Sequence, residues 1–260
     1  MTIFQVDAFN NQLFKGNPAA VIPLEKWISD ELMQSIAEEN NLSETVFFVK
    51  NEHSFNIRWF TPACEVDLCG HATLAAAHII FTELNYAENM LEFNSKSGKL
   101  TVKKNEDWYT LNFPSEEINE IKTPTYLEEA LNIPILKTYK GKWKLLIELE
   151  NEKDILNLTP NFSLLSKLES DGIIVTSKGT NVDFVSRFFA PKLNINEDPV
   201  TGSAHTLLIP FWAKKLNKTT LNAIQLSKRV GILKCNYFND RVEMSGQAVT
   251  YLKGELTLKL

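Results

Sequence analysis

The sequence predicts an α+β protein made of two related halves, each a series of strands with one central apolar helix. Short runs that alternate apolar and polar residues recur along the chain, which is typical of half-buried strands. A longer pattern occurs twice: residues 60–62 (Phe-Thr-Pro), acidic residues and residues 69–72 (Cys-Gly-His-Ala) are echoed by residues 189–191 (Phe-Ala-Pro), acidic residues and residues 201–204 (Thr-Gly-Ser-Ala). We therefore expect an internal duplication, with a short insertion in the second copy.

The first half is expected to combine strands with two helices. Ser29 can cap a helix that carries Asp30 and Glu31 in its first turn. A second, more apolar helix begins at Gly70 or His71, where a polar loop gives way to helix-favouring residues. The expected strands cover residues 3–9, 19–22, 46–49, 55–60, 91–93, 99–102 and 109–113.

The second half is expected to repeat this order after a passage that starts at Ser115. Its central helix begins near Gly202 and is apolar on most sides, and Pro210 lies early enough to bend this helix rather than abolish it. The expected strands cover residues 143–149, 172–175, 184–189, 232–237, 241–244, 248–252 and 256–258. We predict two domains, residues 1–114 and 115–260, with a last strand that can cross back to the first half.

Composition and charge narrow the classes of partner. The 260 residues are 44% hydrophobic, which is enough to bury a substantial core. With 27 basic against 32 acidic residues the net charge is -5, so the chain lacks the electrostatic footprint of a nucleic-acid or anionic-membrane binder. No apolar run approaches the roughly 20 residues of a membrane span, and the first residues do not form a leader, which predicts a cytoplasmic protein. A small-molecule substrate is the expected partner.

The spacing of cysteines and histidines shows no metal signature. The three cysteines, Cys64, Cys69 and Cys235, cannot form a complete disulfide framework, so reduced thiols are expected. His71 and His78 lie seven residues apart, two helical turns, which is too far for a single ion without other ligands. The sequence therefore predicts no metal site.

The starts of the two central helices are candidate anion-binding sites. The first turn of a helix presents unpaired backbone N–H groups and partial positive charge, both of which suit a carboxylate. These turns begin at Gly70, after Cys69, and at Gly202, after Thr201. Two related halves would place the two helix N-termini face to face across a cleft.

Acidic residues beside the predicted strands offer a general acid or base. Glu44 stands where a loop meets the apolar run 46–49, so it is either a solvated residue at a strand start or a partly buried carboxyl group suited to proton transfer. Glu65 and Asp67 lie together in a loop, where solvent-facing acids are the commoner case. The segment 16–22 is either a loop beside a cleft or an ordinary tight turn.

Several stretches, taken in order, resemble the phenazine biosynthesis PhzF-like family, whose fold is similar to that of diaminopimelate epimerase. They are residues 7–9 (Asp-Ala-Phe), 16–21 (Gly-Asn-Pro-Ala-Ala-Val), 41–45 (Asn-Leu-Ser-Glu-Thr), 60–62 (Phe-Thr-Pro), 65–73 (Glu-Val-Asp-Leu-Cys-Gly-His-Ala-Thr) and 197–205 (Glu-Asp-Pro-Val-Thr-Gly-Ser-Ala-His). The resemblance spans nearly the whole chain. It implies two pseudo-symmetric domains, each a barrel-like, mostly antiparallel sheet wrapped around a central helix, with the active site between them. It also implies that no cofactor is needed and that the protein is a homodimer.

The resemblance also implies a chemistry. In this family the glutamate of the Ser-Glu-Thr stretch, here Glu44, moves a proton, with help from residues that match His71, Asp198 and Ser203. The expected activity is a cofactor-independent isomerisation that moves a proton between carbons of a small amino- or carboxylate-bearing metabolite. Two alternatives stay open, a non-catalytic binding member of the same fold and a thiol-based racemase. The racemase is disfavoured because Thr201 stands where a second cysteine would be needed, and a hydroxyl is a far weaker acid than a thiol.

Overall fold

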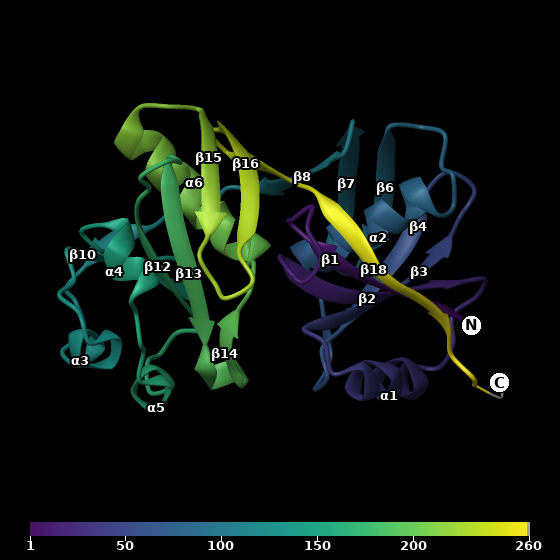
Figure 1. Cartoon of the computed structure of the whole chain (residues 1–260), viewed down its shortest axis with the longest axis horizontal. Helices are drawn as coiled ribbons and strands as arrows, with labels where there is room; N and C mark the ends of the chain where they lie inside the picture. The colour runs from purple at the N-terminus through teal and green to yellow at the C-terminus, as the bar shows by residue number, and fades with distance from the viewer. Residues whose placement is uncertain (259–260) are drawn as a thin grey trace. The chain divides into compact units, whose positions relative to one another are not determined.

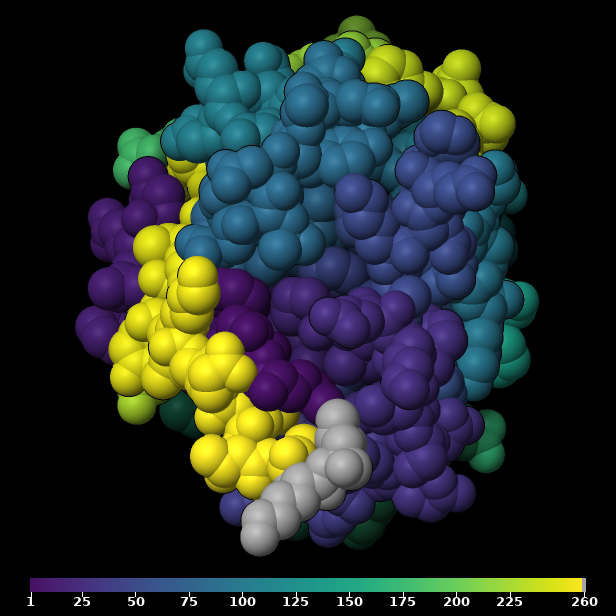
Figure 2. Space-filling model, turned by 90° about the vertical axis from the view of Figure 1, so that its right-hand side faces the viewer, coloured from purple at the N-terminus to yellow at the C-terminus, as the bar shows by residue number. Residues whose placement is uncertain are grey.

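The chain forms two compact units. A computed structural model describes residues 1–258, and in it the first unit contains residues 1–112 together with the segment from Ser245 onward. The second unit contains residues 113–244 (Figure 1). The end of the chain belongs to the first unit because strand β18 (Ala248–Glu255) pairs antiparallel with β1 (Thr2–Ala8). Figure 2 shows this yellow C-terminal segment lying against the purple N-terminal residues.

The first unit is a mostly antiparallel sheet around one helix. Strands β2 and β3 pair in parallel, as do β4 and β6, whereas the pairs β1–β2, β3–β4, β6–β7 and β7–β8 are antiparallel. The further strands are β2 (Asn17–Leu24), β3 (Glu44–Lys50), β4 (Phe55–Phe60), β5 (Glu65–Val66), β6 (Met90–Ser95), β7 (Gly98–Asn105) and β8 (Trp108–Pro114).

Helix α2 (Gly70–Thr82) is the centre of the first unit. Every residue from His71 to Phe81 is buried, and the helix packs against β1, β2, β3 and β18. A helix that is apolar on all sides has to be enclosed, which is why this segment lies inside the sheet. The second helix, α1 (Asp30–Asn40), lies at the edge, and as predicted the Ser29 side chain caps it by accepting from the backbone N–H of Leu32 at 3.3 Å.

The second unit repeats this arrangement. The pairings β11–β12 (parallel), β12–β13 (antiparallel), β13–β15 (parallel) and β15–β16 (antiparallel) have the same order as β2–β3, β3–β4, β4–β6 and β6–β7. The strands are β9 (Asn119–Ile121), β10 (Lys137–Lys140), β11 (Lys144–Glu148), β12 (Gly172–Lys178), β13 (Phe184–Ala190), β14 (Ile195–Asp198), β15 (Thr220–Gln225), β16 (Gly231–Phe238) and β17 (Arg241–Gly246). The helices are α3 (Leu127–Leu131), α4 (Glu152–Leu156), α5 (Phe162–Leu165), the short 3-10 turn η1 (Pro191–Leu193) and α6 (Gly202–Leu216). The predicted α+β class is confirmed.

Helix α6 continues through Pro210, and the sequence had predicted that this proline would not abolish the helix. A proline inside a helix has no N–H for the carbonyl four residues earlier, here that of Thr206. That carbonyl instead accepts the backbone N–H of Glu116 at 3.0 Å. The helix therefore continues to Leu216, with the lost hydrogen bond replaced by one from a neighbouring segment.

The structure differs from the sequence expectations at residues 256–258, and it adds the short strands β5, β9, β10 and β14. Residues 256–258 form no strand of their own: β18 ends at Glu255, and beyond it Leu256 still donates its backbone N–H to the carbonyl of Met1 at 2.8 Å. Conversely, β15 (Thr220–Gln225) was not expected, although its residues alternate between buried and exposed positions in the manner of a half-buried strand.

Candidate active site

In the first unit, side chains from β2, β3 and α2 meet at the start of α2. Glu44 begins β3 and is in register with Ala19 of the parallel strand β2. Asn17 precedes Ala19 by two positions, so the side chains of Asn17 and Glu44 project from the same face of the sheet. Because α2 packs on that face, His71 in its first turn lies between them.

The two ring nitrogens of His71 have different neighbours. Its Nε2 is 3.1 Å from Oε2 of Glu44. Its Nδ1 is 3.2 Å from Nδ2 of Asn17 and 3.5 Å from Sγ of Cys69. The His71 side chain is only 5% exposed and that of Glu44 15% exposed. The imidazole therefore lies between a carboxyl group on one side and an amide and a thiol on the other.

The pair formed by Glu44 and His71 has spare hydrogen-bonding capacity. Oε2 of Glu44 and Nε2 of His71 are buried atoms, and neither makes a hydrogen bond of good geometry with any other side chain of the described chain. Buried polar atoms in native proteins nearly always have partners, and exceptions call for an explanation. A bound molecule that supplies the missing partner is one such explanation.

Electrostatics assign the protons at this cluster. Burial raises the pKa of the Cys69 thiol, and the negative charge of Glu44 acts in the same direction. Burial alone lowers the pKa of His71, but Cys69 and Glu44 outweigh it and hold that pKa well above its ordinary value. Because the buried thiol stays protonated, we attribute the stabilisation of the imidazolium to the carboxylate of Glu44. Cys69 is thus a poor candidate for a thiolate base.

The same three groups could be taken for a metal site. Glu44, Cys69 and His71 each offer a ligand atom, and these atoms lie within 4.8 Å of one another. However, the carboxylate faces Nε2 while the sulfur faces Nδ1. An ion bound at either ring nitrogen would reach one of these partners and not the other unless the ring turned. The arrangement suits proton transfer along the ring better than chelation of one ion.

In the second unit, a hydrogen-bonded loop leads into α6. The hydroxyl of Thr201 donates to Oδ2 of Asp198 at 2.5 Å. Gln225 of β15 braces this loop, because its Nε2 donates to the carbonyl of Asp198 at 2.8 Å and its Oε1 accepts the N–H of Thr201 at 2.9 Å. Ser203 is exposed in the first turn of α6, and His205 donates from Nδ1 to the carbonyl of Thr201 at 2.8 Å.

Both helix starts lie where the sequence placed them. Cys69 is the N-cap residue of α2, which begins at Gly70, and Thr201 is the N-cap residue of α6, which begins at Gly202. Neither side chain caps its helix in the described structure, so the first-turn N–H groups are not taken up by a cap. Of the predicted site residues, Glu44, Cys69 and His71 meet in the first unit, and Asp198 and Thr201 meet in the second.

An arginine in each unit anchors the loop before the central helix. Arg58 of β4 binds Glu65 through Nε at 2.7 Å and Nη2 at 2.8 Å. Arg187 of β13 binds Glu197 in the same way, at 2.7 and 2.9 Å. Glu65 is therefore a structural partner of Arg58 and not part of an acidic pair with Asp67. The sequence did not predict these pairs or Gln225, and it left the segment that contains Asn17 open between a loop beside a cleft and a tight turn.

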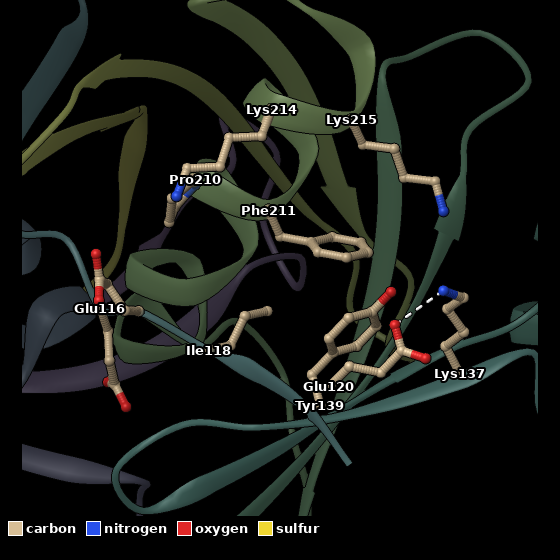
Figure 3. A pocket seen from close by; sticks show the side chains of 10 residues that line it. Glu116, Ile118, Glu120, Lys137, Tyr139, Pro210, Phe211, Lys214 and Lys215 are labelled. Atoms are coloured by element: carbon tan, nitrogen blue, oxygen red, sulfur yellow. Dashed lines mark hydrogen bonds and ion pairs between the residues drawn. The ribbon is translucent and has the colours of Figure 1, made fainter. Parts of the chain in front are cut away.

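A separate pocket of about 610 Å³ lies in the second unit (Figure 3). The rings of Phe211 and Tyr139 meet edge-on in it at 5.1 Å, and Lys137 pairs with Glu120 at 2.8 Å. Its described lining residues include none of the predicted site residues. The predicted site residues thus lie outside this pocket, and we take the buried cluster of Glu44, Cys69 and His71 as the candidate active site.

Comparison with known proteins identifies the family. The family model described as "Phenazine biosynthesis-like protein" (PhzC-PhzF) matches residues 6–254. The chain belongs to the PhzC-PhzF family. An uncharacterized isomerase of Pseudomonas aeruginosa is 48% identical over 254 residues, which are 98% of this chain and 97% of that protein. The resemblance deduced from the sequence is confirmed.

Solved structures agree on the fold. A phenazine biosynthesis protein of the PhzF family from Enterococcus faecalis is 50% identical and superposes with a TM-score of 0.97 over 99% of both chains. A probable proline racemase from Agrobacterium radiobacter is only 8% identical, with a TM-score of 0.68 over 99% of this chain and 93% of that chain. The latter likeness shows that this family shares an epimerase-like fold. No helix within residues 1–258 is long and apolar enough to cross a membrane.

Proposed function

We propose that this chain is a cofactor-independent isomerase that moves a proton between carbons of a small amino- or carboxylate-bearing metabolite. The observation that carries the proposal is the buried pair of Glu44 and His71, whose facing atoms are 3.1 Å apart and have no other partner among the described side chains. The names of relatives that share about half of its residues support the isomerase class.

In the proposed reaction Glu44 acts first as a base and then as an acid. Its carboxylate takes a proton from one carbon of the substrate, and the electron pair left behind delocalises toward a neighbouring unsaturated or carboxylate group. The protonated Glu44 then returns the proton to a different carbon. His71, which faces Glu44 through Nε2, stabilises the carboxylate before the transfer and between turnovers.

Binding of the substrate is assigned to the helix starts. Backbone N–H groups at Gly70 and Gly202, together with the Ser203 hydroxyl, can donate to a substrate carboxylate or to the negative charge that develops during proton transfer. Asp198 is the proposed partner of a substrate amine. We propose that these groups act on one substrate, and that the protein works as a homodimer, which light scattering on the purified protein will test.

The alternatives make different use of the same residues. A thiol racemase needs an ionised Cys69, yet burial raises the pKa of this thiol, and Thr201 offers no second thiol. A binding member of the fold has no need of a carboxyl group that faces a histidine in a buried site. The isomerase therefore accounts for more of the cluster than either alternative.

The test is solvent-proton exchange. Metabolites are incubated with the protein in deuterated water, and deuterium uptake is read by mass spectrometry. Glu44→Gln should reduce the rate by roughly 10²- to 10⁴-fold, the usual effect of losing a general acid or base. Cys69→Ala should retain most of the rate, and Cys64→Ser, which changes an exposed cysteine, is the control.

Three outcomes would count against the proposal. If Glu44→Gln exchanges as fast as the wild type, Glu44 is a structural residue. If instead Cys69→Ala abolishes exchange, the racemase gains. If no compound in a broad panel of amino and hydroxy acids exchanges while one binds in calorimetry, the chain is a binding member of its family.

A further inference from the structure

Asn17 is a fully buried polar residue whose side chain faces the candidate catalytic histidine. It begins β2 and is 0% exposed, and its Nδ2 lies 3.2 Å from Nδ1 of His71. Its position depends on the preceding turn. Gly16 has a positive φ of 65°, and a Cβ on Gly16 would lie 2.1 Å from the carbonyl oxygen of Ala8. Only glycine allows β2 to start this close to β1 and bring Asn17 under α2.

The neighbours of Nδ1 determine which ring nitrogen carries the proton. A neutral imidazole has one N–H donor and one bare nitrogen, and hydrogen bonds to the ring select between the two forms. The amide of Asn17 presents N–H groups to Nδ1, and the Cys69 thiol, kept protonated by burial, presents S–H. Both are donors, so in the neutral ring Nδ1 is the bare nitrogen and the proton lies on Nε2.

That assignment directs the proton of His71 toward Glu44. With Nε2 protonated, this nitrogen turns a positive N–H group toward the carboxylate, whose Oε2 is 3.1 Å away, whereas the other tautomer would set a lone pair against it. When the ring takes a second proton at Nδ1, a half-turn of the amide presents oxygen in place of nitrogen, and Nε2–H still faces Glu44. We propose that Asn17 is a positioning residue that keeps the Nε2 proton of His71 directed at Glu44.

This inference rests on the proposed function for its purpose, but its test needs no substrate. The tautomer of a histidine ring can be read directly from the ¹⁵N chemical shifts of its two nitrogens, because protonated and bare nitrogens resonate far apart. At alkaline pH, where the ring is neutral, wild-type His71 should show a bare Nδ1 and a protonated Nε2. A protonated Nδ1 in the neutral ring would overturn the proposal.

Two substitutions separate positioning from packing. Asn17→Leu has a similar shape but no donor, and the ratio of Nε2–H to Nδ1–H forms should fall roughly 2- to 10-fold, as expected for one lost hydrogen bond. Asn17→Asp offers only acceptors, so Nδ1 should become protonated. If Asn17→Leu leaves both nitrogen shifts unchanged, Glu44 and Cys69 set the tautomer without Asn17, which then only packs.

The same spectra contain an internal control and a check on Glu44. His78 lies on the same helix with its ring between the hydroxyls of Tyr109, at 2.9 Å, and Thr250, at 3.0 Å, and its shifts should not respond to Asn17. Glu44→Gln should keep Nδ1 bare because Asn17 still donates to it; a protonated Nδ1 there would show that the carboxylate sets the tautomer. The nitrogen shifts test the role of Asn17, and proton exchange tests the isomerase function. The two proposals can therefore fail separately.

Discussion

The ion pair between Arg187 and Glu197 should be a major stabilising contact of the second unit. Arg187 is 12% exposed and uses every guanidinium nitrogen: Nε and Nη2 bind Glu197, while Nη1 donates to the carbonyls of Ile155 at 3.2 Å and Leu158 at 2.9 Å. Its guanidinium carbon also lies 5.0 Å from the centre of the Phe189 ring. The pair thereby joins β13, the loop before α6 and the end of α4.

Arg187→Met is the most informative substitution, because methionine keeps much of the aliphatic stem and removes only the charge and its hydrogen bonds. Breaking this partly buried pair from one side leaves the Glu197 carboxylate, itself 22% exposed, without its partner. The expected loss of unfolding free energy therefore lies near or below the lower end of the about 3–5 kcal/mol that a fully buried pair costs. Adding the energies of the single charged hydrogen bonds of Arg187 would give a larger loss, but the hydrogen bonds of one side chain are not additive. Urea unfolding, monitored by tryptophan fluorescence, gives the change in unfolding free energy from the shift in the urea concentration at the midpoint.

A matched variant makes the result decisive. Arg187→Met combined with Glu197→Gln should lose less stability than Arg187→Met alone, since no partly buried charge is then left without a partner. Arg187→Lys keeps the charge but not the two-pronged contact, and should fall between the wild type and Arg187→Met. A loss of at most about 1 kcal/mol for Arg187→Met would place the pair among exposed ion pairs and refute the reasoning.

Two further predictions concern stability. Gly16→Ala should lower the free energy of unfolding by on the order of 2–4 kcal/mol, because the new Cβ would meet a backbone oxygen and the residue has a positive φ. Gly98→Ala also has a positive φ but nothing within 4 Å of the new Cβ, so it should lose clearly less in thermal unfolding. Equal losses would show that the clash at Gly16 is relieved. Burial lowers the pKa of His205 to about 4 from 6.5, so the unfolded chain binds a proton that the folded chain does not between these pH values. The contribution of His205 to the free energy of unfolding should therefore be fully present above pH 6.5 and fall by up to about 3 kcal/mol toward pH 4. His205→Gln should flatten that part of the pH profile measured by urea unfolding. An unchanged slope would mean that folding does not lower the pKa of His205.

Local patterns sufficed to predict much of the fold. The apolar run after Gly70 predicted a helix enclosed by the sheet, and α2 is buried along almost its whole length. The repeated motif predicted two related halves, and the strand pairings repeat in the same order. The short strands β10 and β14 gave weaker signals, because each has few buried residues and is held by its neighbours more than by its own alternation.

The candidate site could be predicted only in part. Glu44 and His71 were found from motifs, but their contact depends on the register of β3 with β2 and on how α2 lies across both strands, which no local pattern specifies. Asn17 was ambiguous for the same reason: in the sequence it belongs to a Gly-Asn-Pro turn, and only the parallel pairing of β2 with β3 brings its amide to the ring of His71. Gln225 was missed together with its strand, β15.

The duplication itself bears on how many bases the site contains. Arg58 is in register with Phe47 of β3, and Arg187 is in register with Val175 of β12. Because the two arginines are equivalent, Glu44, three residues before Phe47, corresponds to Gly172, three residues before Val175.

The second unit has no room for a carboxyl group at that position. A Cβ on Gly172 would lie 2.3 Å from the ring of Phe188, so the space that Glu44 occupies in the first unit is filled by an aromatic side chain in the second. Thr201 and Ser203 likewise replace Cys69 and His71 at the start of α6. A racemase that removes a proton on one face and adds one on the other needs a base in each half. A chain whose second half has neither a carboxyl group at the position of Glu44 nor a thiol at the position of Cys69 is suited instead to taking a proton and returning it with the same group, as the proposed isomerisation requires.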